Sequence, residues 1–182
     1  LRLGQDRTAQ LSSMRVDQRP MANPDKDQTT ASSFALGLNH AIGTGYKLRF
    51  TYAVDDVTSE YDDDAFGFGN PSDVHELARK TRSSQITWLA QYNPAWTSEL
   101  ALSHTTHNLE DRLNASLKTG DYTYGLANSR QNGLRWSNEF ALDSQTQLLL
   151  GLDHSVEDFE SDARLSGYNT TKTDTGYFAG LG

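Results

Sequence analysis

The feature that most constrains this chain is a two-residue alternation of apolar and polar side chains. It is clearest in residues 46–54, where aromatic and aliphatic residues occupy every second position and Lys47, Arg49 and Thr51 lie between them. Successive side chains of a β-strand point to opposite faces of the sheet. The pattern therefore predicts a strand with one apolar and one polar face.

The alternation recurs along the chain, which predicts several strands of the same kind. They are expected at residues 34–38, 86–92, 100–103, 134–142 and 148–156, with a last one beginning at 177–181. The second face of these strands carries small and charged side chains, which suit a water-filled lumen as well as bulk water. The charged positions are Arg49, Glu99, Arg135, Glu139 and Asp153.

The connections between the predicted strands alternate in length. Residues 39–45, 93–96 and 143–146 are short and rich in turn-forming residues. Residues 55–83, 108–131 and 157–173 are long and polar, and a further polar stretch precedes Ser32. Long structureless loops are uncommon in soluble domains, whereas tight turns on one side and long loops on the other are typical of outer-membrane barrels.

Composition excludes several other classes. The longest apolar run covers only residues 148–152, so helices that need about 20 apolar residues to span a bilayer are excluded. A net charge of −8 without a basic run argues against nucleic-acid binding. The chain has no cysteine, which excludes disulfides and thiolate zinc sites.

These observations predict an all-β protein, an antiparallel up-and-down transmembrane β-barrel of which this chain forms a partial wall of about seven or eight strands. The alternative is a soluble β-sandwich that binds a partner or ligand. Because the chain starts at Leu1 and stops within a predicted strand, we expect residues 1–182 to be an internal segment of a longer protein.

Several motifs resemble the barrel of TonB-dependent outer-membrane receptors, and among these the vitamin B12 (cobalamin) receptors. The resemblance is carried by two successive strand motifs that are expected to form a hairpin. The first is residues 132–140, with Trp136, and the second is residues 148–157, with Gly151 and Asp153. Residues 172–181 are similar to the strand opening of the family, in which Thr175 and Gly176 precede an aromatic residue. The family's plug domain, its TonB-binding segment and the C-terminal end of its barrel have no counterpart in these residues.

The resemblance implies a plugged barrel of about 22 strands in the outer membrane of a Gram-negative cell. Such a receptor takes up a scarce large nutrient, here expected to be cobalamin, and is energised through TonB by way of the plug segment. Its other expected partners are outer-membrane lipid and lipopolysaccharide. A ferric-siderophore receptor has the same architecture, and a passive porin or adhesin barrel without a plug is a further alternative.

The acidic stretch at 55–64 is a candidate calcium site, because Ca²⁺ takes six to eight oxygen ligands. Cobalamin receptors order outer loops with calcium, so the resemblance points the same way. The alternative is a solvated, self-repelling acidic loop. The candidate ligands are Asp55, Asp56, Asp62, Asp63 and Asp64.

Aromatic residues in the expected outer loops are candidate contacts for a flat ligand such as a corrin ring. Self-packing of the loops or contact with lipopolysaccharide is the alternative. The candidates are Tyr61, Phe66, Phe68, Tyr122, Tyr124 and Tyr168. No nucleophile elbow, metalloprotease motif or phosphate-binding loop is present, so we expect a non-enzyme that needs no cofactor.

The register of one strand yields a prediction for two neighbouring residues. Leu150 is expected to face lipid, where an arginine costs roughly 2–4 kcal/mol at the bilayer midplane. Gly151 is expected to face the lumen, so its replacement by alanine should be much milder.

Overall fold

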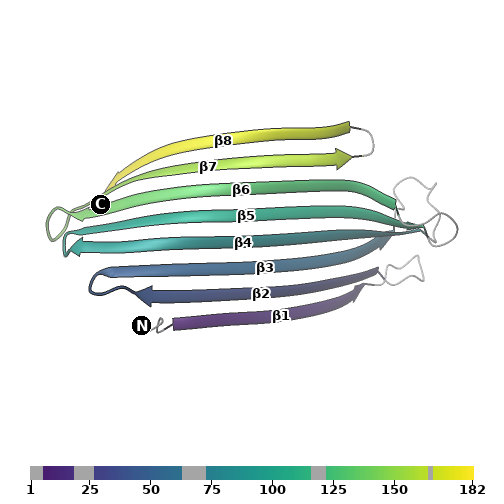
Figure 1. Cartoon of the computed structure of the whole chain (residues 1–182), viewed down its shortest axis with the longest axis horizontal. Coiled ribbons are helices and arrows are strands. Elements are labelled where there is room, and N and C mark those ends of the chain that lie inside the picture. Colours follow the sequence, from purple (N-terminus) through teal and green to yellow (C-terminus); the bar gives the residue numbers. More distant parts are fainter. Residues whose placement is uncertain (1–5, 19–26, 63–72, 116–121, 164–165) are drawn as a thin grey trace.

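The computed structural model describes residues 6–18, 27–62, 73–115, 122–163 and 166–182. These residues form eight strands in a single sheet whose spatial order is the chain order (Figure 1). The strands are β1 (Asp6–Gln18), β2 (Asp27–Ala41), β3 (Tyr46–Asp62), β4 (Asp73–Asn93), β5 (Trp96–Ala115), β6 (Tyr122–Ala141), β7 (Gln147–Ala163) and β8 (Ser166–Leu181).

Each strand pairs antiparallel with the next one along the chain, which confirms the predicted all-β, up-and-down arrangement. The sheet does not close into a barrel, because β1 and β8 lie at its two opposite edges. The described residues therefore form one open antiparallel meander and not a closed barrel.

Three tight turns lie together at one end of the sheet (Figure 1), where the sequence predicts turns. Between β2 and β3, Gly43 and Gly45 have φ of 73° and 85°, in the left-handed region that glycine favours. After β6, the Asp143 carboxylate accepts hydrogen bonds from the amides of Gln145 and Thr146 at 2.8 and 2.9 Å. These bonds, led by the one from Gln145, hold the pKa of Asp143 below its usual value.

The prediction of long loops at the other end of the sheet is wrong. Most of residues 55–83, 108–131 and 157–173 continue the strands: β3 runs to Asp62, β5 to Ala115 and β7 to Ala163. The polar stretch before Ser32 likewise contains β1. The alternation ends because both faces become polar there, but the backbone hydrogen bonds that pair strands need no apolar side chain.

The sheet is one layer thick and has almost no core. Of the described apolar residues, only Ala90 and Ala101 are buried. The chain exposes 13154 Å², whereas a compact monomer of 20.2 kDa exposes roughly 8,800 Å². Large apolar side chains therefore stay half exposed on one side of the sheet. The described residues contain no helix with the length and hydropathy needed to cross a bilayer.

Candidate functional site

One face of the half of the sheet next to the tight turns is apolar from β2 to β8. Cross-strand register places Leu48, Trp88 and Leu100 in one row, and this row continues through Trp136 and Leu152. We call this surface the apolar band. It comprises the even-numbered residues of 34–42, 46–54, 84–92, 96–104, 132–140 and 148–156 and the odd-numbered residues of 173–181.

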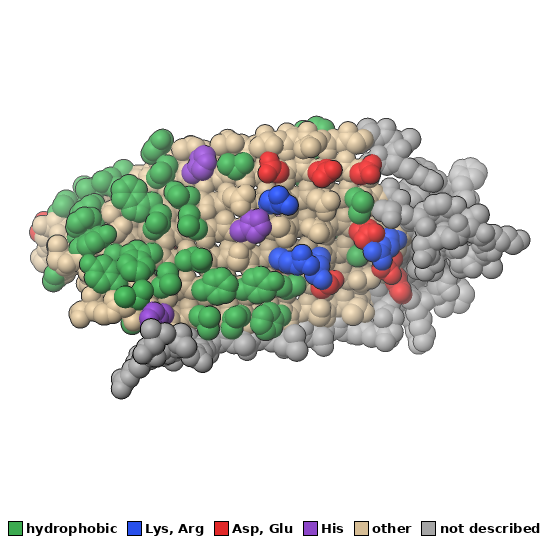
Figure 2. Space-filling view, viewed as in Figure 1, with side chains coloured by type: hydrophobic (Ala, Val, Ile, Leu, Met, Phe, Trp, Pro, Cys, Tyr) green, Lys and Arg blue, Asp and Glu red, His purple; other side chains and the backbone are tan. Residues whose placement is uncertain are grey.

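No aspartate, glutamate, lysine or arginine occupies any position of the apolar band, although 22% of the chain is charged. Figure 2 shows the result as a continuous field of apolar side chains near the turns, with the charged side chains gathered towards the other end. Sheets of soluble proteins bury such a face against a second layer. Within the described part of this chain no second layer covers it.

Aromatic rings line the turn end of the apolar band from β3 to β6. Tyr46 contacts Trp88 and Tyr92 with ring centroids 5.8 and 6.2 Å apart. Tyr92 then meets Trp96 at 4.3 Å, and Trp96 stacks on Phe140 at 5.7 Å. The five rings form a ladder across four strands, and ring pairs of this kind add about 0.5–1.5 kcal/mol each beyond their buried area.

Two of the three indole nitrogens of this region donate hydrogen bonds within the sheet. Trp96 Nε1 donates to Asn138 Oδ1, and Trp136 Nε1 donates to Ser98 Oγ, each at 3.1 Å. Asn138 and Ser98 are only 6% and 8% exposed, although they lie on a face without a covering layer. The large rings therefore cover the polar groups of the band and satisfy them at the same time.

The far end of the apolar band is marked by polar pairs rather than by rings. His104 Nδ1 lies 2.7 Å from Asn132 Oδ1, and His154 Nδ1 lies 2.8 Å from Thr175 Oγ1. His107, three residues further along β5, pairs with Thr81 on the opposite face. His104 and His107 therefore point to opposite faces of the sheet.

The opposite face of the same strands is polar and lined by small residues; we call it the polar face. Arg49 Nε donates to Asn39 Oδ1 at 3.0 Å, and Arg135 Nε lies 3.7 Å from Asp153 Oδ1. A pocket of about 470 Å³ opens on this face. Its walls include Gln85, Glu99, Ser103, Gln131, Arg135 and Asp153.

The structure adds one contact to the prediction that Gly151→Ala is milder than Leu150→Arg. Gly151 pairs with Phe178 across β7 and β8, and a Cβ at position 151 would overlap the Phe178 ring. The same ring lies 5.4 Å from the Arg135 guanidinium carbon. Gly151 is therefore on the polar face as expected, but it is the place where an aromatic ring covers the backbone, so alanine there displaces the ring.

Of the candidate calcium ligands, only Asp55 and Asp56 have described side chains, and the sheet does not bring these two together. Asp55 and Asp56 are consecutive residues of β3, so their side chains point to opposite faces and cannot share one ion. Asp56 Oδ2 forms an ion pair with Lys80 Nζ at 2.9 Å. The side chain of Asp62, and all of Asp63 and Asp64, lie outside the described residues. Among the residues described, no group of three or more histidine, aspartate or glutamate side chains is placed to hold a metal.

Of the candidate aromatic ligand contacts, the four that belong to described strands lie at the end of the sheet away from the turns. Tyr168 of β8 is 58% exposed and contacts the Phe159 ring at 6.2 Å. Tyr61 is the next-to-last residue of β3, and Tyr122 and Tyr124 lie at the start of β6, but their side chains are not described. Phe66 and Phe68 lie outside the described residues. Their proposed role in ligand binding remains a prediction.

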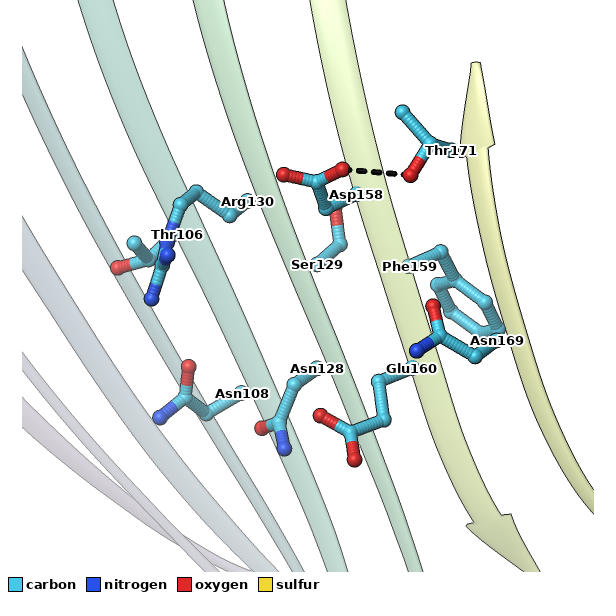
Figure 3. Close-up of a pocket in the computed structure, with 10 residues that line it drawn as sticks. All are labelled: Thr106, Asn108, Asn128, Ser129, Arg130, Asp158, Phe159, Glu160, Asn169 and Thr171. Carbon is cyan, nitrogen blue, oxygen red and sulfur yellow. Dashed lines mark hydrogen bonds between the residues drawn. The ribbon is translucent and has the colours of Figure 1, made fainter.

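A second pocket, which the sequence did not indicate, opens at the same end of β5–β8 (Figure 3). It measures about 490 Å³ and is lined by amide, hydroxyl and charged side chains. Asp158 accepts a hydrogen bond from Thr171 Oγ1 at 2.8 Å across it. The sequence analysis missed this pocket because it assigned most of the lining residues to loops. They come together only because the strands extend past the apolar band.

Comparison with known proteins found neither a family model nor a curated protein that matches this chain. The resemblance to TonB-dependent receptors therefore rests on the motifs in β6–β8 alone. What the fold establishes at this point is a single antiparallel meander with one uncharged face and one polar face.

Proposed function

We propose that the apolar band lies against the hydrocarbon of a bilayer and that this sheet is part of the wall of a transmembrane β-barrel. The observation that carries the proposal is the uncharged band itself. Its segment in β3, residues 46–54, has the length of the ~9–11 residues that a tilted strand needs to cross a membrane. On the face of the apolar band, the corresponding segments of β4, β6 and β7 likewise carry no charged side chain.

The aromatic ladder supports the same proposal. Trp and Tyr are enriched where a bilayer meets water, since their rings are apolar and their N–H and O–H groups are polar. The ladder of Tyr46, Tyr92 and Trp96 borders the tight turns. In this arrangement the turns lie at the periplasmic side of an outer membrane, and the polar halves of β3–β8 extend beyond the outer surface.

The polar face suits the interior of such a barrel. The Arg135–Asp153 pair lies at the depth of the apolar band but on the other side of the sheet. Charged side chains at that depth are tolerated where they line water or a plug and not where they face lipid. A soluble β-sandwich would place a second sheet against the band, and the described residues supply none.

The parent protein is proposed to be a TonB-dependent outer-membrane receptor for a large scarce nutrient, in the first instance cobalamin. The support is the motif resemblance in β6–β8 and the match between the polar face and a plugged lumen. In this role the receptor meets TonB through its plug segment. It is proposed to bind and transport its ligand without catalysing a reaction. A ferric-siderophore receptor is the second candidate, and a passive barrel is the third.

Two neighbouring leucines test the orientation of the sheet. Leu149 and Leu150 of β7 have nearly equal exposed fractions of 39% and 41%, but they lie on the polar face and the apolar band, respectively. In the full-length protein, Leu150→Arg is expected to lower the free energy of unfolding in lipid by roughly 2–4 kcal/mol, less if it lies off the midplane. Leu149→Arg is the matched control.

The measurement is urea unfolding in phospholipid vesicles, together with heat-modifiable mobility on gels. Leu149→Arg is expected to change the free energy of unfolding by less than about 1 kcal/mol, because an arginine there meets water or other polar groups. If the two substitutions lowered the free energy of unfolding equally, the proposal that the apolar band faces lipid would be contradicted.

The nutrient is tested separately, by equilibrium binding of labelled cyanocobalamin to outer-membrane vesicles that contain the full-length protein. Tight binding that weakens with a calcium chelator supports both the cobalamin assignment and an acidic calcium site. Tight binding that a chelator leaves unchanged supports the cobalamin assignment and contradicts the calcium site. Correct insertion without binding moves the assignment to a ferric siderophore or another nutrient.

A further inference from the structure

The pocket of about 470 Å³ on the polar face has a floor of small residues. We call it the polar-face pocket. Ser103 of β5 pairs with Gly133 of β6, and Ala101 pairs with Arg135. A Cβ at position 133 would come within 2.6 Å of Ser103 Oγ, so glycine there leaves the room that the serine occupies. The longer side chains of neighbouring positions therefore rise around a low centre.

The rim of the polar-face pocket consists of planar hydrogen-bonding groups, with hydroxyls between them. It carries the amides of Gln85 and Gln131, the charged groups of Glu99, Arg135 and Asp153, and the hydroxyls of Ser103, Ser137 and Ser155. Among the described residues that line the pocket, no side chain on the polar face is apolar and larger than that of alanine. The pocket therefore offers hydrogen bonds and almost no apolar contact.

Some of these groups are held in place, and others still lack a partner. Arg135 Nε lies 3.7 Å from Asp153 Oδ1, and its guanidinium carbon lies 5.4 Å from the Phe178 ring. In the part of the chain that the structure describes, the side chains of Glu99 and Gln131 make neither a hydrogen bond nor an ion pair. An incoming polar ligand would supply the partners that these two groups lack.

The lining selects for one ligand chemistry. An apolar ligand would take water from the polar groups without gaining an apolar contact. An anion is disfavoured, because Asp153 balances the charge of Arg135 and Glu99 adds a further negative charge. A sugar ring matches the lining, because its adjacent hydroxyls donate and accept hydrogen bonds. Planar carboxylate, amide and guanidinium groups bond to two such hydroxyls at once.

The polar-face pocket lies at the level of the apolar band but on the other side of the sheet. Leu102 and Leu134, which alternate with the lining residues of β5 and β6, belong to the band and pair with each other. In the proposed barrel this level is inside the lumen, on the path of any solute that crosses the wall's height.

We propose that the polar-face pocket binds a neutral oligosaccharide. Glu99 and Gln131 bond to sugar hydroxyls from β5 and β6, Arg135 and Asp153 bond to hydroxyls further along the ring, and the small floor admits the ring itself. The inference goes beyond the proposed function, because neither the apolar band nor the motif resemblance implies a saccharide. It requires only that the polar face meets water.

The test is isothermal titration calorimetry with three neutral tetrasaccharides: maltotetraose, cellotetraose and mannotetraose. The full-length protein is placed in phosphatidylcholine nanodiscs, free of glycoside detergents that would compete. At least one sugar is expected to bind, and Glu99→Ala is expected to weaken that binding about 10-fold, because a hydrogen bond to a charged group is lost. Glu139→Ala is the matched control and should leave binding unchanged. Glu139 is an exposed carboxylate on the same face that does not line the pocket.

A second variant fills the polar-face pocket without changing its charge. Ser103→Phe would place a ring over Gly133, in the way that Phe178 lies over Gly151, so the sheet has room for it. This variant should abolish measurable sugar binding. Circular dichroism and heat-modifiable mobility check that it folds and inserts as the wild-type protein does.

The outcomes separate this inference from the proposed function. If none of the three sugars binds to the inserted wild-type protein at millimolar concentration, the inference is overturned and the membrane assignment stands. Binding that Glu99→Ala and Ser103→Phe leave unchanged also overturns it, because the sugar then binds elsewhere; so does an equal loss in Glu139→Ala. If the protein does not insert but binds a sugar in buffer with the expected loss in Glu99→Ala, the inference stands and the proposed function fails.

Discussion

The two halves of the same strands obey different rules. In the half next to the turns, β3 alternates strictly between apolar and polar residues, and its apolar positions join a band that no charge interrupts. In the other half, Asp56 and Lys80 form an ion pair on the same face of the sheet that carries Phe50 and Ile86 nearer the turns. Strand pairing continues through both halves without a break. Side-chain polarity therefore sets what each half contacts, while backbone pairing sets the sheet.

The largest effect expected within this comparison concerns the aromatic ladder. Trp96→Ala removes ring contacts with Tyr92 and Phe140 and the hydrogen bond to Asn138. It should lower the free energy of unfolding in lipid vesicles by about 1–3 kcal/mol. Trp96→Phe keeps most ring contact and should lose about 1 kcal/mol or less. Equal losses would mean that ring packing contributes nothing to the turn half.

A smaller effect is expected on the polar face. Gly151→Ala must displace the Phe178 ring and should lower the free energy of unfolding by about 1 kcal/mol, as small-to-large changes do in packed sites. Gly125→Ala in β6 is the control, since a Cβ there meets no atom within 4 Å. Chemical denaturation of both variants checks the prediction, and a Gly125→Ala variant that loses as much would contradict the proposed contact.

The smallest effect is expected in the outer half. Lys80→Gln breaks the ion pair with Asp56, but both side chains are about two-fifths exposed, at 40% and 41%. Such pairs contribute about 0.2–1 kcal/mol and are screened by salt. The loss should therefore shrink between low and high salt in denaturation experiments. A loss that does not depend on salt, or one as large as that of Trp96→Ala, would erase the distinction between the two halves.

The same contrast explains what the sequence could predict. The turn half was predictable because one apolar face makes the alternation visible, as at residues 46–54 in β3 and 148–156 in β7. The Asp143 turn was also predictable, since its carboxylate caps the following amides.

The outer half was misread as loops, because strands that are polar on both faces carry no periodic signal. β1 was missed for the same reason. The second pocket could not be read from sequence, since it joins residues of different strands, such as Thr106 of β5 and Arg130 of β6. The overlap of Gly151 with Phe178 required the register of β7 and β8.

The most direct test of the account is a spin-label scan along β7 of the full-length protein in vesicles, in a background without other cysteines; residues 1–182 contain none. Single cysteines at each position of 148–160 would report collision rates with oxygen, which enters lipid, and with a water-soluble nickel chelate. The account predicts high oxygen access at even-numbered positions up to Val156, low access at the odd-numbered positions, and loss of this alternation from Asp158 onward. Uniform access to the nickel chelate on both faces of 148–156 would contradict it.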